Sequence, residues 1–148
     1  MFNPSRDESR DFLFEAWRKY GVNEPLSALE SVAVGVIAEH AEYHALLSNR
    51  DKFLARDYAP EAGETNPFLH LAMHIAIREQ IAIDQPQGVL GAHKTLTQKR
   101  DSVMQAEHEM MDCLAEMIWQ AQRNRAAPDA AVYLRCLATK VDRRVGNR

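Results

Sequence analysis

The apolar positions of this chain recur at intervals of three and four residues, which is the spacing of one face of an α-helix. Leu29, Ala33 and Val36 follow this spacing, and no run of alternating β-branched residues is long enough for a strand. The pattern therefore predicts an all-α protein with a bundle-like core of four longer helices plus one or two short helices.

Residues that favour helix ends define the first predicted helix. Pro4 is typical of a first helical turn and Gly21 of the position after a last one, so we expect a helix from Pro4 to Tyr20 with Asn3 as its cap. The side chains expected to be buried on this helix are Leu13, Trp17 and Tyr20.

A capping box opens the second predicted helix, because Ser27 is followed three residues later by Glu30. Its apolar stripe continues through His40 to residue 47, so we expect His40 to face the core. A short helical stretch over residues 51–56 leads into YAPEAGETNP, which predicts a loop by its proline, glycine and asparagine content.

The third predicted helix runs from Pro67 to about Asp84, between a cap at Thr65 or Asn66 and a stop at Pro86. One of its faces carries Phe68, Leu71, Ala72 and Ile75, and the opposite face carries His70, Met73, His74, Ile77 and Ile81. A helix that is apolar all round is expected to be buried, either within the domain or against another chain.

A long helical pattern follows over residues 89–124, with a break expected near Arg100 and Asp101. His108 lies on the apolar stripe of this pattern, beside Met104 and Met111. Pro128 opens a last predicted helix, which runs to about residue 140.

The composition is that of a single globular domain. The chain has 148 residues, of which 46% are hydrophobic, so we expect one helical domain over residues 1–140 and a frayed basic tail over residues 141–148. A net charge of −3 leaves no large basic face, so nucleic acid is not an expected partner. No stretch approaches the roughly 18 apolar residues of a membrane span, and the start MFNPSRDESRD is too charged for a signal peptide. We therefore expect a cytoplasmic protein without a membrane partner.

The cysteines, Cys113 and Cys136, stand apart from each other and from any CxxC motif. In a reducing compartment such residues behave as small hydrophobic side chains. The sequence therefore predicts no disulfide.

The histidines carry the most specific chemical signal. His40 and His44 are spaced i, i+4, as are His70 and His74 in NPFLHLAMHIAI. On a helix this spacing puts two rings on one face, about 5–6 Å apart at Cβ, as required to present two imidazoles to one metal ion. We expect His70, His74 and His108, with His44 or His40, to hold one divalent transition metal. His93 lies in a polar stretch and is expected at the surface.

An imidazole-rich site inside a bundle suits zinc, iron or nickel. Glu107 and Asp112 are the candidates for an additional ligand or for a carboxylate that orients a ligating histidine. Neither the HExxH motif nor the repeated ExxH motif of di-iron bundles occurs, so the expected site holds a single ion. If three protein ligands leave a coordination position open, metal-bound water can act as a nucleophile, as in a hydrolase or a transferase.

A non-enzymatic alternative uses the same residues. Buried histidines are commonly hydrogen-bonded to carbonyl or carboxylate groups. The all-apolar third helix would then serve a protein partner or a homodimer. No motif in the chain indicates a particular reaction, so the sequence leaves open whether the protein is an enzyme.

Several segments resemble a known bacterial family over nearly the whole chain, up to about residue 138. They are MFNPSRD, HAEYHALL, YAPEAGETNPFLHLAMHIAIREQIAIDQPQG, EHEMMDCLAEMIWQAQRN and PDAAVYLRCL. The chain resembles the "domain of unknown function 1841" family, which implies a small cytoplasmic bacterial protein and supplies no substrate or catalytic residue. Relatives often read His-Pro-Glu-Tyr-His where this chain has residues 40–44. A proline at that place starts a helix, so the resemblance raises the question whether His40 and His44 lie on one continuous helix.

Overall fold

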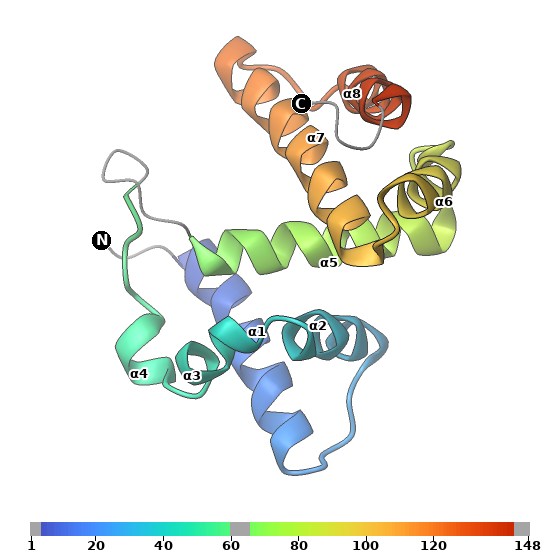
Figure 1. The fold of residues 1–148 in the computed structure, drawn as a ribbon. Helices are drawn as coiled ribbons and strands as arrows, with labels where there is room; N and C mark the ends of the chain where they lie inside the picture. Colours follow the sequence, from blue (N-terminus) through green and yellow to red (C-terminus); the bar gives the residue numbers. More distant parts are fainter. Residues whose placement is uncertain (1–3, 60–65, 144–148) are drawn as a thin grey trace. The chain divides into compact units, whose positions relative to one another are not determined.

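A computed structural model describes residues 4–59 and 66–143, and this part of the chain is all-α, with bundle-like packing of its helices (Figure 1). It contains eight α-helices, one 3-10 helix and no strand within those ranges. The elements are α1 (Pro4–Gly21), α2 (Ala28–Ala38), η1 (Ala41–Tyr43), α3 (His44–Leu47), α4 (Arg50–Phe53), α5 (Pro67–Ile83), α6 (Val89–Arg100), α7 (Val103–Asn124) and α8 (Ala130–Asp142).

The contacts within the chain divide it into two compact units, residues 1–75 and residues 76–148. The boundary falls inside α5, so the first half of this helix belongs to the first unit and its second half to the second. The expectation of one domain over residues 1–140 stays a prediction, and residues 144–148 of the expected basic tail lie outside the described residues.

The first unit packs α1 against α2 and α3. Its core is formed by apolar side chains from these helices and the start of α5, among them Leu13, Phe14, Ala33, Val36, Ile37, Leu47, Phe68 and Leu71. Helix α1 matches the predicted bounds to within one residue. Tyr20 was expected to be buried and is 52% exposed, because it lies in the last turn of α1, where its ring stacks on Trp17 instead.

The capping box at the start of α2 is confirmed, with Ser27 Oγ accepting from the Glu30 amide at 3.1 Å. The predicted end of this helix is wrong. Helix α2 stops at Ala38, and His40 has φ −122° and ψ 67°, outside helical values. The 3-10 helix η1 and the four-residue α3 follow. This break answers the question that the family resemblance raised about His40 and His44.

The second unit packs α6, α7 and α8 against one another. The predicted break near Arg100 is confirmed, since Asp101 adopts a left-handed conformation with φ 53° and Ser102 caps α7. Tyr133 of α8 is fully buried and donates its hydroxyl hydrogen to Gln80 Oε1 at 2.6 Å. Burial raises the pKa of this phenol.

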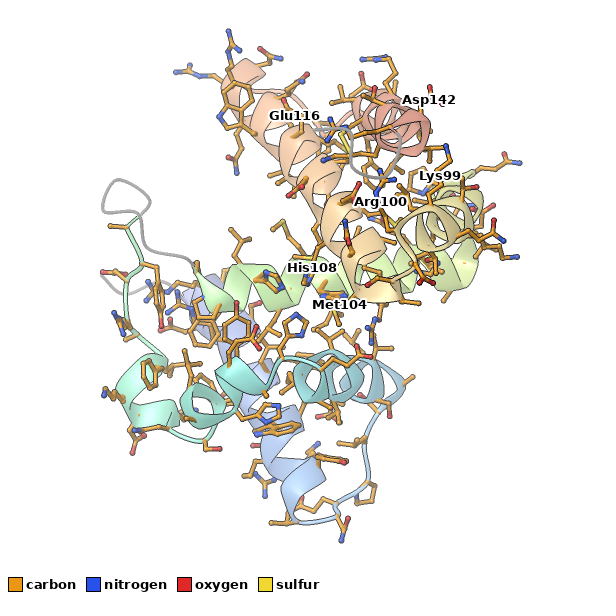
Figure 2. All side chains as sticks on the ribbon, in the orientation of Figure 1. Lys99, Arg100, Met104, His108, Glu116 and Asp142 are labelled. Carbon is orange, nitrogen blue, oxygen red and sulfur yellow. A yellow bond between two sulfur atoms is a disulfide. The ribbon has the colours of Figure 1, made fainter. Side chains whose placement is uncertain are left out.

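A disulfide joins α7 to α8 through Cys113 and Cys136, which corrects the prediction that these cysteines form none (Figure 2). The two residues are 23 apart in sequence, but the short connection between these helices folds back and brings their Cα atoms to 5.4 Å. This separation lies in the range that a disulfide spans. Spacing along the chain does not reveal such a pair.

Helix α5 is less buried than its composition predicts. Asn66 caps it, and Phe68, Leu71, Ile75 and Ile77 are buried as expected. Leu69 and Ile83 are 53% and 68% exposed, so α5 is not buried on every side within this chain. They share a strip of α5 with exposed Ala72, Ala82 and Glu79, and single apolar residues on such a strip are ordinary in proteins.

No helix in the described ranges combines the length and the apolar character that crossing a bilayer requires.

Candidate metal centre

The geometry at the end of α2 determines which nitrogen of His40 carries its proton. His40 Nδ1 lies 2.7 Å from the carbonyl oxygen of Val36, and a carbonyl oxygen only accepts hydrogen bonds. Nδ1 therefore carries the hydrogen, and in the neutral ring Nε2 presents a lone pair. An imidazole that is held through one nitrogen by a backbone carbonyl is the usual arrangement of a metal-ligating histidine.

Two histidines of α5 face this lone pair. His70 Nε2 lies 3.0 Å from His40 Nε2, and the ring centroids of His70 and His74 lie 4.9 and 5.0 Å from that of His40. One potential ligand nitrogen from each of the three rings lies within 4.8 Å of the others. The i, i+4 pair of α5 thus points its rings to one place, together with a third ring from the segment after α2.

This histidine set, His40, His70 and His74, is shielded from solvent. His40 is 2% exposed and His74 is fully buried, while His70 is half-buried. Tyr43 closes one side, with its ring parallel to His40 at 5.7 Å between centroids and edge-on to His70 at 5.9 Å. Burial, more than the nearby carboxylate of Glu42, raises the pKa of the Tyr43 phenol, so this ring stays neutral.

His44 is not brought into the histidine set, so of the two alternatives that the sequence offered, His44 or His40, it is His40 that lies beside His70 and His74. Its Nε2 lies 2.7 Å from the carbonyl oxygen of Ile37, and its ring packs on Trp17 at 4.6 Å between centroids. Because the chain breaks at His40, the two histidines no longer share a helix face. Instead, His40 and His44 each donate to one of the last carbonyls of α2, those of Val36 and Ile37.

His108 belongs to the second unit, where it is half-buried on α7 (Figure 2). Its participation in the histidine set stays a prediction.

Glu107 is held by other side chains of the second unit. It is 3% exposed, and its Oε1 accepts from Arg78 Nε and Nη2 at 3.2 and 3.1 Å, while its Oε2 lies 3.0 Å from His93 Nε2. His93 was expected at the surface and is half-buried, because this carboxylate anchors it. The arrangement ties α5, α6 and α7 together around one carboxylate.

Asp112 lies at the surface of α7. Its side chain is 70% exposed and faces Lys140 at 3.4 Å. A carboxylate in that position interacts with solvent and a surface cation, which does not support the proposed role beside a histidine.

The donor atoms of the histidine set are all imidazole nitrogens. Such a set suits zinc, iron, nickel and copper, whereas magnesium and calcium require oxygen ligands. Two contributors were not found by sequence analysis. The Val36 carbonyl carries no sequence signal, and Tyr43 could have been noted only as an aromatic residue beside His44 in HAEYH.

The fold and the histidine set define an all-α protein with three converging, largely buried imidazoles. Residues 5–139 match the family described as "Domain of unknown function (DUF1841)", and the chain belongs to that family. Searches of curated proteins and of solved structures found no match to this chain.

Proposed function

We propose that the histidine set binds one divalent transition metal ion. The observation that carries the proposal is the lone pair of His40 Nε2, which the Val36 carbonyl directs toward His70 Nε2 at 3.0 Å. Burial supports it further, because an imidazole removed from water needs a partner for each ring nitrogen.

The distances are close to those of a loaded site. Zinc–nitrogen bonds of about 2.0–2.1 Å place neighbouring ligand nitrogens of a tetrahedron about 3.3 Å apart. The His40 and His70 nitrogens, 3.0 Å apart, need only a small separation to accept an ion between them. The remaining nitrogens lie within 4.8 Å of one another, which is close enough to support the proposal.

The number of ligands determines what the ion does. With three imidazoles a tetrahedral ion keeps one position for water, whose pKa falls to about 7 on zinc, and this supports a hydrolase or a transferase. With His108 as a fourth ligand, as the sequence predicts, the ion would be enclosed and would serve to hold the fold.

The decisive experiment measures metal content in protein purified without an affinity tag. We expect about one zinc, iron or nickel ion per chain in the wild type, and loss of most of it in the double variant His70→Ala, His74→Ala. His93→Gln is the matched control, since it removes one histidine but keeps an amide hydrogen for Glu107. Equal metal content in the double variant and the wild type would leave the non-enzymatic interpretation, in which the histidines only hydrogen-bond to one another and to the backbone.

Cobalt substitution tests the ligand number. The visible spectrum of Co²⁺ responds to the number and type of its ligands, so we compare the wild type with His108→Ala. An unchanged spectrum, together with a shift when azide is added, indicates three protein ligands and an open position. A changed spectrum in His108→Ala, with no response to azide in the wild type, indicates the enclosed site.

A further inference from the structure

A small pocket in the first unit lies between α1 and the start of α5. It has a volume of about 170 Å³, and the residues that line it include Arg6, Ser9, Arg10, Asn66 and Phe68. Pockets for drug-sized ligands are about 300–1,000 Å³, so this one suits an ion or a molecule of a few atoms. The guanidinium of Arg10, which binds no carboxylate among the described residues, lies in this small volume with the hydroxyl of Ser9 and the amide of Asn66, and this combination indicates a polar, negatively charged occupant.

Arg10 contributes a buried positive charge to the pocket. It is 3% exposed, and its guanidinium carbon lies 4.4 Å from the centre of the Phe68 ring. Nη1 donates to the carbonyl oxygens of Leu54 and Arg56 at 3.0 and 2.7 Å. Within residues 4–59 and 66–143, Nε and Nη2 make no hydrogen bond and no carboxylate lies within ion-pair distance of Arg10.

The carboxylates nearest to Arg10 interact with another arginine. Arg6 binds Asp7 at 3.1 Å and Asp57 at 2.6 Å. Among the described residues, burial therefore acts on the charge of Arg10 without a contacting counter-ion. It lowers the pKa of this guanidinium, which nevertheless stays protonated at neutral pH. Buried charges in proteins are ordinarily paired, so Arg10 is an exception that requires an explanation.

We propose that this pocket binds a small oxyanion, a phosphate or a short carboxylate, through the Nε and Nη2 groups of Arg10, with Arg6 and Ser9 completing the contacts. A guanidinium presents two parallel hydrogens in the geometry that matches two oxygens of such an anion. The positive end of the α5 dipole, next to Asn66, adds to the attraction.

The oxyanion pocket is separate from the histidine set. Phe68 and Ala72 of α5 line the pocket, whereas His70 and His74 are offset from them by two positions, or about 200° around the helix. An anion in the pocket therefore does not occupy the place of a metal ion, and the proposal stands whether or not the protein binds metal.

Titration calorimetry on chelator-treated protein tests the proposal. The chelator removes any metal ion from the histidine set, so that an anion cannot bind to the metal instead of to the pocket. Orthophosphate and malonate are titrated separately in a buffer without other oxyanions. We expect saturable one-site binding of at least one of them, and the comparison shows which source of oxygens the pocket prefers. At ~10 mM anion, a site with a Kd of about 1 mM is about nine-tenths filled. The proposal is overturned if neither orthophosphate nor malonate shows saturable binding up to that concentration.

Variants separate this pocket from general charge attraction. Arg10→Lys keeps the charge and removes the paired hydrogens, so we expect binding to weaken about tenfold or more. Arg50→Gln is the matched control, because Arg50 is an exposed arginine of the same unit that binds Asp11 at 2.5 Å, and it should bind as the wild type does. If Arg10→Lys does not fold, the variants Ser9→Ala, at an exposed residue, and Arg6→Gln, at a half-buried one, decide. Wild-type affinity in a folded Arg10→Lys, or in both of these variants, overturns the proposal.

Discussion

Reduction of the Cys113–Cys136 disulfide should destabilise the second unit substantially. The bond closes a loop with a sequence separation of 23 residues between α7 and α8. In the chain-entropy account, closing a loop of that length lowers the entropy of the unfolded chain, and this raises the free energy of unfolding by about 3.4 kcal/mol at 25 °C. Reduction breaks one S–S bond and leaves the rest of the packed core in place. Nearly all of the lost stability should therefore come from the greater conformational entropy of the unfolded chain.

Urea denaturation followed by circular dichroism measures this difference. With a slope of about 1–3 kcal/mol per molar urea, the midpoint for the second unit should fall by roughly 1–3 M in the presence of a phosphine reductant. The double variant Cys113→Ala, Cys136→Ala is the control, since its midpoint should not respond to the reductant. If reduction lowered the free energy of unfolding of the wild type by less than about 0.5 kcal/mol, the reasoning would be refuted. The unfolded loop would then be about as restricted without the disulfide as with it.

Three further predictions concern stability. Ser27→Ala removes the side-chain cap of α2 and should lower the free energy of unfolding by about 1 kcal/mol, measured by urea denaturation, with Ser31→Ala as a control within the same helix. Glu107→Ala leaves Arg78 and His93 without their shared carboxylate and should cost about 3 kcal/mol in the same assay; a cost below about 1 kcal/mol would contradict a buried ion pair. Burial favours a higher pKa for Glu109, but the two hydrogen bonds from Arg100 hold it below its ordinary value. The stability from this pair is present above the unfolded-state pKa and is lost as the pH falls through the folded-state pKa, so Glu109→Gln should flatten the acid limb of a stability–pH profile.

Local signals in the sequence were sufficient for much of the fold. The capping box at Ser27 and the break at Asp101 each act through a few neighbouring backbone groups, and the structure shows both, while Gly21 is the last residue of α1 rather than the first after it. The break at His40 was not visible in the pattern of apolar residues, because the stripe continues past it. Only the resemblance to relatives with a proline at that place raised the question of a break there.

The features that sequence analysis missed depend on contacts between distant segments. The pairing of Cys113 with Cys136 follows from the way α8 folds back on α7, which no periodicity encodes. The anchoring of His93 by Glu107 likewise depends on the packing of α6 on α7. By contrast, the choice of His70 and His74 as candidates followed from their spacing alone, since two residues one turn apart on a helix must share a face.

The bond between His40 and the Val36 carbonyl gives one side chain two tasks. The same ring that terminates α2 also directs its second nitrogen toward α5, so an ion held by that nitrogen would slow the fraying of the preceding turn. Amide hydrogens of Glu39 and His40, which donate to Val36 and Ile37, would then exchange with deuterium more slowly in metal-loaded protein. Metal binding at the histidine set would then be detectable as slower amide exchange at the end of α2.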